Sequence, residues 1–271
     1  MGIFKERDYN IIDKAVGYHE TTGYPKKIAH SGYAKTPADK NSSLQIQQRL
    51  LEGVKNNNTV PRVALQSTNP EVLSNIKRKN MSIVNADKMN SKDIEIELIY
   101  PLPGTTYDGW VKELSSMMPI KKIKINVYPC LILPNAELND KAYKKRFKMK
   151  TKTIPFNVDM EECEIITSME SMSYEDVVKG WMFVWIVKNF WFEPILRYIY
   201  YEYFKADVKI KDFFVKFQDF LENNPTSTTG TLYNRLKNNI HNTYDDYDQV
   251  VDYNYCIGYF LEHVNLVLKD F

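Results

Sequence analysis

The spacing of apolar residues changes part-way along this chain, and that change constrains the fold more than any other feature of the sequence. Between Arg62 and Ile154 apolar side chains recur at every second position in short runs, and Ile94–Tyr100 alternates them with glutamates. Beyond about residue 170 they recur three or four positions apart instead. The pattern predicts an α+β fold, with a mixed sheet and short helices in the N-terminal half and a helical C-terminal half.

Helix-start signals support this division. Asn69 followed by Pro70 predicts one short helix in the sheet-forming part, and Thr106 or Asp108 can cap another. In the C-terminal half a capping box at Ser173 and Asp176 is expected to open the first of a series of helices. These are predicted at Ser173–Lys188, Pro194–Phe204, Val208–Glu222, Thr231–Ile240 and Tyr247–Lys269.

Composition predicts three consecutive segments. Residues 1–60 combine lysines and turn residues with weak periodicity, which is typical of a polar basic arm, although Ser42–Val54 can form one amphipathic helix. Residues 61–160 are expected to form an α/β sheet domain. Residues 161–271 are expected to form a helical domain rich in aromatic residues.

Charge is distributed unevenly along the chain. Residues 1–155 contain 26 Lys+Arg and 15 Asp+Glu, a net charge of +11, whereas residues 156–271 contain 10 and 19, a net charge of −9. Such a chain can present a basic surface to nucleic acid or to an anionic membrane surface, and can associate head to tail with copies of itself as a homo-oligomer. Alternatively, the two halves neutralise each other within one fold.

The densest positive charge lies on a strand predicted at Lys144–Ile154 and on its expected neighbour. One hypothesis is a polyanion-binding face, and the other is an edge strand that its lysines protect from aggregation. No aromatic residues alternate with the lysines in the manner of a base-stacking surface. The residues predicted to bind the polyanion are Lys121, Lys122, Lys124, Lys144, Lys145, Arg146, Lys148, Lys150 and Lys152.

Aromatic residues are concentrated between Trp181 and Phe204, more densely than one face of a helix can bury. One interpretation is an oligomer interface or a membrane-facing surface, because aromatic rings are enriched in both. The other is a helical hairpin buried in the core. The first interpretation assigns the interface to Trp181, Trp185, Trp191, Tyr200 and Tyr201.

Motifs of enzymes and of metal sites are missing from the sequence. It contains no GxGxxG, GxxxxGK[ST], HExxH or GxSxG pattern, and its histidines and three cysteines show no metal-ligand spacing. We therefore expect a protein that is not an enzyme and needs no cofactor or metal, while an enzyme lacking familiar motifs remains an alternative. With no apolar run of bilayer length and no signal-peptide pattern, we expect an intracellular protein, in the cytoplasm or nucleus of a host cell or in a virion.

Two local patterns suggest functions. The predicted strand, turn and helix of Ile94–Met117, the lysine-rich N-terminal segment and Tyr128-Pro129-Cys130-Leu131, which has the YPxL form of a viral budding motif, together resemble a rhabdovirus matrix protein over less than a tenth of the chain. Lys209–Ile240 is similar to a helix-turn-helix. In that case the Thr226–Thr229 hydroxyls, Asn234, Arg235, Lys237 and Asn238 would meet DNA.

The leading hypothesis is a non-enzymatic structural or assembly protein of a virus, phage or mobile element. The abundance of Asn, Lys, Ile and Tyr is typical of such AT-rich genomes. Such a protein would self-associate and contact nucleic acid or membrane through its basic N-terminal half. The alternative is a nucleic-acid-binding regulator or replication accessory that uses the helix-turn-helix-like segment.

Overall fold

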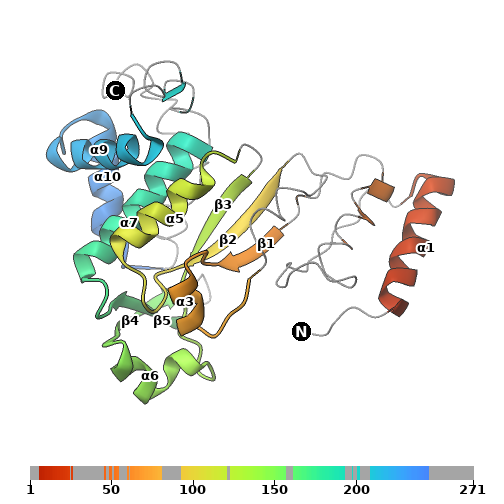
Figure 1. Ribbon diagram of the computed structural model, residues 1–271, viewed down its shortest axis with the longest axis horizontal. Helices are drawn as coiled ribbons and strands as arrows, with labels where there is room; N and C mark the ends of the chain where they lie inside the picture. Colours follow the sequence, from red (N-terminus) through yellow and green to blue (C-terminus); the bar gives the residue numbers. More distant parts are fainter. Residues whose placement is uncertain are drawn as a thin grey trace. The chain divides into compact units, whose positions relative to one another are not determined.

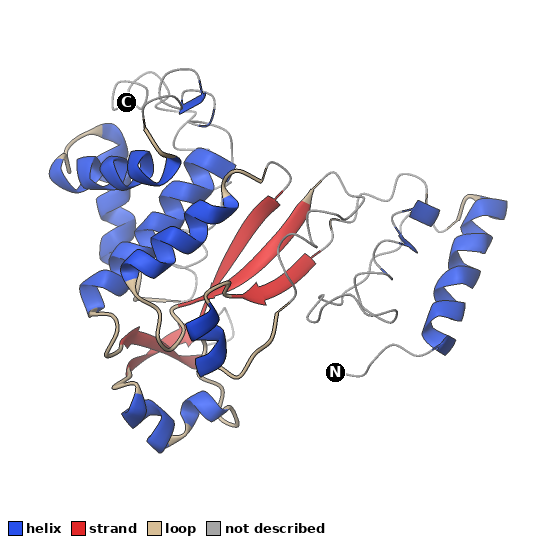
Figure 2. Ribbon diagram, in the orientation of Figure 1, coloured by secondary structure: helices blue, strands red, loops and turns tan. Residues whose placement is uncertain are grey.

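The protein has an α+β fold, seen in a computed structural model that contains both helices and strands, with helices in its C-terminal half (Figure 2). The structure describes residues 6–24, 26, 46, 49–50, 52–54, 60, 62–80, 93–120, 123–156, 161–192, 197, 200–201 and 208–243. No helix among them is both long enough and apolar enough to span a bilayer. The predicted strand Met81–Val84, the helix Tyr247–Lys269 and most of the helix Pro194–Phe204 lie outside the described residues.

The chain divides into two compact units, neither of which is continuous in sequence. The first comprises Met1–Thr68, Lys77–Leu98 and Ile120–Asn126, and the second comprises Asn69–Ile76, Ile99–Pro119 and Val127–Phe271. The three segments predicted from composition are consecutive, because composition contains no information on which distant segments of the chain pack together.

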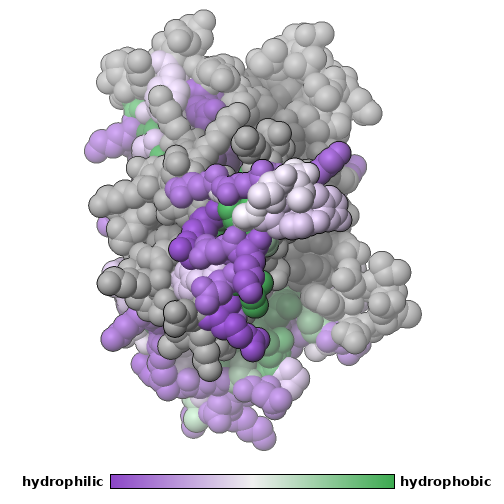
Figure 3. Space-filling view, turned by 90° about the vertical axis from the view of Figure 1, so that its right-hand side faces the viewer, coloured by the Kyte–Doolittle hydropathy of each residue, from purple (hydrophilic) through white to green (hydrophobic). Residues whose placement is uncertain are grey.

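The first unit contains a helix, α1 (Glu6–Thr22), where the sequence predicted a polar arm. Tyr9, Ile12, Val16 and buried His19 recur along one side of it at helical spacing. Arg49 contacts that helix from a distant part of the sequence, since its guanidinium lies 3.2 Å from a carboxylate oxygen of Asp13 and covers the Tyr9 ring. The apolar periodicity of α1 is weak in the sequence because its buried face mixes aliphatic, aromatic and histidine side chains. Among the described residues on the face drawn in Figure 3, most are hydrophilic.

A three-stranded sheet has the order β1 (Arg62–Gln66), β2 (Ile94–Tyr100) and β3 (Ile123–Pro129). β1 pairs with β2 in parallel, with Val63 opposite Ile96. Burial alternates along β2, and every second residue from Ile94 to Tyr100 is buried, as the sequence predicts for a half-buried strand. β2 and β3 begin in the first unit and continue into the second.

The second unit begins with α3 (Pro70–Asn75), whose first N–H groups are capped by the Asn69 side chain as predicted. α5 (Tyr107–Met117) begins after Thr106, which accepts a hydrogen bond from the Gly109 N–H at 3.1 Å. α7 (Tyr174–Val187) opens with the predicted capping box of Ser173 and Asp176. It continues into a π-helical turn, η2 (Lys188–Phe192), and α9 (Ile210–Asn223) and α10 (Thr228–Asn239) pack against it (Figure 1).

The predicted strand Lys144–Ile154 is wrong in its first part. After the short 3-10 turn η1 (Glu137–Asn139), Asp140 caps a helix, α6 (Lys141–Arg146), and the strand β4 (Lys150–Phe156) starts only afterwards. The four-residue spacing of Tyr143 and Phe147, whose rings lie 4.9 Å apart, fits one helical turn as well as a strand.

A second strand, β5 (Glu161–Ser168), lies where the sequence placed the start of the helical domain. It pairs antiparallel with β4, and Cys163 is opposite Ile154. Its three glutamates resemble a solvated turn, but Lys144 of α6 and Thr151 of β4 both donate hydrogen bonds to one of them, Glu164. The first helix after β5, α7, begins at Tyr174, as the capping box at Ser173 predicted.

The aromatic cluster forms the core of the second unit. Trp181, Trp185, Trp191 and Tyr200 are each at most 4% exposed, and Tyr201 is half-buried against Trp191. Tyr100 stacks on Trp110 and donates a hydrogen bond to the Val177 carbonyl. The single chain thus buries the rings that were assigned to an oligomer interface, in agreement with the alternative of a buried helical core.

Candidate functional site

Seven basic side chains are concentrated on α6 and β4 and are called here the basic ridge: Lys141, Lys144, Lys145, Arg146, Lys148, Lys150 and Lys152. Asp140 starts α6 by accepting hydrogen bonds from two backbone N–H groups at 2.8 and 3.1 Å. Three of the cations occupy the last turn of α6, where they complement the negative end of the helix dipole.

Tyr143 anchors the basic ridge to the rest of the second unit. Its side chain is 7% exposed, and its hydroxyl donates a hydrogen bond to the Asn75 carbonyl at 2.9 Å. Lys148, with φ of +48°, ends the turn that leads from α6 to β4. The ridge cations therefore project from a backbone that is fixed at several points.

Three cations of the basic ridge have partners within the chain. Lys144 Nζ lies 2.8 Å from Glu164 Oε1, Lys148 Nζ lies 2.5 Å from Glu170 Oε1, and Lys152 Nζ donates to the His241 carbonyl at 2.8 Å. Partial burial raises the pKa of Glu164, but hydrogen bonds from Lys144 and Thr151 outweigh it and hold the pKa below its ordinary value. Glu164 is thus a carboxylate at neutral pH and neutralises Lys144.

The other four cations of the ridge are all exposed: Lys141, Lys145, Arg146 and Lys150. No carboxylate of the described residues forms an ion pair with them. The Arg146 guanidinium covers the Phe147 ring at 4.8 Å, which limits its motion while its hydrogen-bond donors stay accessible. Lys141 was not among the predicted residues, because the alternating pattern predicted a strand that begins only at Lys144.

The other predicted cations are Lys121, Lys122 and Lys124. Lys124 lies on β3 in the first unit and is 3.8 Å from an Asp93 carboxylate oxygen. Lys121 and Lys122 lie outside the described residues. The predicted face on two neighbouring strands is therefore replaced by one helix and one strand of the second unit.

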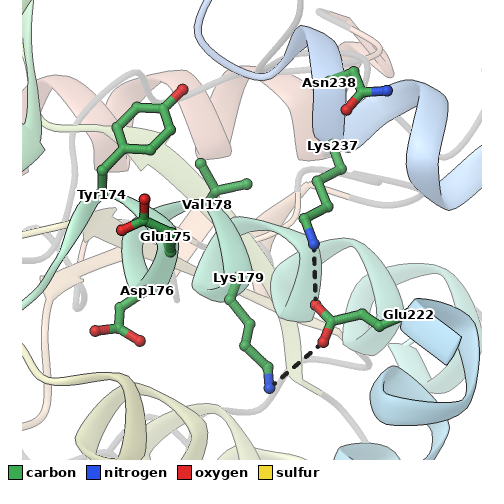
Figure 4. A pocket seen from close by; sticks show the side chains of 8 residues that line it. All are labelled: Tyr174, Glu175, Asp176, Val178, Lys179, Glu222, Lys237 and Asn238. Atoms are coloured by element: carbon green, nitrogen blue, oxygen red, sulfur yellow. Dashed lines mark hydrogen bonds and ion pairs between the residues drawn. The ribbon is translucent and has the colours of Figure 1, made fainter.

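A pocket of about 440 Å³ lies between α7 and the helices α9 and α10 (Figure 4). Glu222 lines one side of the pocket and forms ion pairs with two lysines, with Lys237 Nζ at 3.3 Å and Lys179 Nζ at 3.7 Å. Lys179 is also 3.5 Å from Asp219. The pocket is lined by Tyr174, Glu175, Asp176, Val178, Lys179, Glu222, Lys237 and Asn238.

A buried hydrogen-bond network contacts two residues that line this pocket, Lys179 and Glu222. The Gln218 amide nitrogen donates to the Lys179 carbonyl at 2.8 Å and to the Tyr233 hydroxyl at 3.1 Å, while its oxygen accepts from the Tyr107 hydroxyl at 2.6 Å. The Tyr233 hydroxyl in turn donates to Glu222 at 3.0 Å. Burial raises the pKa of both tyrosines, so both hydroxyls remain protonated donors.

Sequence reasoning missed this network. Its only signal is a glutamine at position 218, within the apolar stripe of α9 next to Phe217. A polar residue on such a stripe indicates a buried hydrogen-bond site only when its partners are known.

The helix-turn-helix-like segment is a helical pair, as predicted, but several of its proposed DNA-binding groups are engaged within the chain. Thr229 is fully buried, and the Asn234 amide donates to the Gly230 carbonyl at 2.8 Å. Lys237 pairs with Glu222 in the pocket. Arg235 and Asn238 are exposed.

The YPxL-like residues are held at the end of β3. Cys130 is buried, which raises the pKa of its thiol to about 12, and its N–H donates to the Tyr100 carbonyl at 3.2 Å. Tyr128 is 38% exposed. These residues are therefore part of the folded structure rather than an exposed linear segment.

No protein-family model matches the chain, and no curated protein matches it in sequence. Within the described part of the chain, no group of three His, Cys, Asp or Glu side chains is arranged to hold a metal ion. The function therefore has to be argued from the basic ridge and the pocket.

Proposed function

We propose that this protein is a non-enzymatic assembly protein that binds a polyanion through the basic ridge, and that the partner is the phosphate backbone of nucleic acid. The observation that supports this proposal is the excess of exposed cations on α6 and β4: Lys141, Lys145, Arg146 and Lys150 have no carboxylate partner among the described residues. Four such groups on a fixed backbone can neutralise several phosphates and release their counterions.

Nucleic acid is favoured over a membrane surface by the polar character of the ridge. The exposed large hydrophobic side chains of the described residues are Ile11, Tyr18, Tyr24, Tyr128, Leu133 and Tyr174, and α6 and β4 contain none of them. Without an apolar side chain to enter the lipid, attraction to a membrane would depend on charge alone, at about 1 kcal/mol per basic residue.

Self-association is part of the proposal on the ground of charge alone. The tryptophans predicted to form an oligomer interface are buried in the single chain. Self-association is therefore supported only by the opposite net charges of the two halves of the sequence. An origin in a virus, phage or mobile element rests on composition and on the matrix-protein resemblance. The helix-turn-helix alternative has less support, because Lys237 forms an ion pair with Glu222 and Thr229 is buried.

Substitution of three ridge cations tests the binding site. In Lys145→Gln/Arg146→Gln/Lys150→Gln, the slope of log affinity for a 20-base-pair duplex against log salt should fall by about 2.7, at about 0.9 for each lost contact. A matched control is Lys209→Gln/Lys211→Gln/Lys216→Gln, which removes the same charge from exposed positions at and on α9. The control should keep the wild-type slope.

Two results would contradict the proposal. If ridge and control variants lose affinity equally, net charge and not the ridge determines binding. If the wild-type chain binds vesicles containing phosphatidylserine but not the duplex, and the ridge variant loses that binding, the partner is a membrane surface.

A further inference from the structure

The carboxylates of Glu164 and Glu170 form ion pairs with two lysines of the basic ridge, Lys144 and Lys148. Glu164 lies on β5, opposite Thr153 of β4, and its backbone carbonyl accepts a hydrogen bond from the Ile132 N–H at 2.8 Å. Glu170 follows β5, and its N–H donates to the Phe147 carbonyl at 2.9 Å. Both acids are thus attached by their backbones to the segments beside the ridge.

The two ion pairs differ in exposure. In the Lys144–Glu164 pair the side chains are 23% and 30% exposed, and Thr151 adds a second hydrogen bond to the carboxylate. In the Lys148–Glu170 pair they are 70% and 58% exposed, so water and salt screen it more strongly. A competing anion should displace Glu170 more readily than Glu164.

We propose that Glu164 and Glu170 are built-in competitors of the phosphate partner, which hold Lys144 and Lys148, respectively, until a polyanion of high charge density displaces them. This inference rests on the polyanion-binding role proposed above. The ridge then presents four cations to any anion and up to six to one that displaces both carboxylates. Regulation of this kind favours densely charged partners, because a sparse anion gains no contact by displacing a carboxylate.

Neutral variants of the two acids test the competition. Glu170→Gln and Glu164→Gln each free one lysine, so the salt slope for the 20-base-pair duplex should steepen by up to about 0.9 for each lysine that wild type does not already use. The effect should be larger for Glu164→Gln. The matched control is Glu162→Gln, which makes the same charge change at an exposed position of β5 opposite Pro155. It should leave the slope at the wild-type value.

A second variant assigns the effect to one lysine. Adding Lys144→Gln to Glu164→Gln should return the slope to that of wild type, because the freed contact is removed again. Thermal unfolding of each variant verifies that the comparison is made between folded proteins.

The outcomes separate this inference from the proposed function. If wild type binds the duplex and both acid variants match Glu162→Gln in affinity as well as in salt slope, the competition is refuted while the binding role stands. If wild type does not bind but Glu164→Gln or Glu170→Gln does, the competition is supported in its strongest form. If no protein in the series binds, both proposals fall.

Discussion

The basic ridge and the α7–α9–α10 pocket contain the same kinds of charged side chain in opposite arrangements. In the pocket, Lys179 and Lys237 both contact Glu222, and Lys179 contacts Asp219 as well. On the ridge, two glutamates form ion pairs with two of the seven cations, and the other five have no acidic partner among the described residues. The same residue type therefore stabilises the fold in one region and is available to a partner in the other.

Burial accounts for this difference. Lys179, Glu222 and Lys237 of the pocket are 30%, 26% and 36% exposed and adjoin the hydrogen-bond network of fully buried Gln218, so a charge without a partner would be poorly solvated there. The ridge cations lie in solvent, where an unpaired lysine has little effect on the free energy of unfolding. A surplus of charge is tolerated only where water can solvate it, and that is why the ridge is the better candidate for binding.

The largest expected effect on stability is that of Gln218→Leu. The change keeps the side-chain volume roughly constant, but it leaves the Tyr107 hydroxyl and the Lys179 carbonyl without their partners in a buried site. We expect the free energy of unfolding to fall by about 2–4 kcal/mol in denaturant titration. Asn223→Leu on the exposed side of α9 is the control, with an expected change within about 0.5 kcal/mol. Equal effects would show that the network does not distinguish the two positions.

Local sequence signals predicted much of the fold. Asn69, Thr106 and the pair Ser173 and Asp176 cap helices where their side chains led us to expect it, because a cap depends on residues within one turn. β2 was predicted with its correct bounds, since burial on one face forces alternation. α1 and β5 were missed, as their buried faces are mixed in character and depend on partners far away in the sequence.

The candidate site was predictable in composition but not in arrangement. The sequence shows seven cations between Lys141 and Lys152, but Glu164 lies 20 residues beyond Lys144, and Glu170 lies 22 residues beyond Lys148. Which lysines are neutralised depends on how β5 pairs with β4. No local pattern contains that information.

His241 connects the two regions and predicts a pH effect of intermediate size. Its ring lies 5.0 Å from that of Tyr174 at the pocket, and its carbonyl accepts the hydrogen bond from Lys152 of the ridge. Burial, and to a lesser degree the charge of Lys152, lower the pKa of His241 to about 4 from the ordinary 6.5. The unfolded chain therefore binds more protons between these two values, and stability is lost as pH falls through that window.

We expect His241 to account for a loss of up to about 3 kcal/mol between pH 6.5 and pH 4, at about 1.4 kcal/mol per pH unit. Unfolding free energies of wild type and His241→Asn, measured across this range, isolate the contribution, since other groups titrate in both proteins. Wild type should approach the variant as the pH falls. A constant difference between the two proteins would show that His241 does not titrate differently on folding.

The smallest expected effect on stability is that of the ridge variant Lys145→Gln/Arg146→Gln/Lys150→Gln, and its small size sharpens the comparison with the pocket. These cations are exposed and have no acidic partner among the described residues, so their removal should change the free energy of unfolding by no more than about 0.5 kcal/mol. Arg146→Gln also removes the contact with the Phe147 ring, which sets the upper part of that range. Thermal and denaturant unfolding, measured with light scattering, distinguish two roles for the same residues. Unchanged stability without added scattering fits a binding surface, whereas increased scattering at unchanged stability would mean that these cations protect the β4 segment from aggregation.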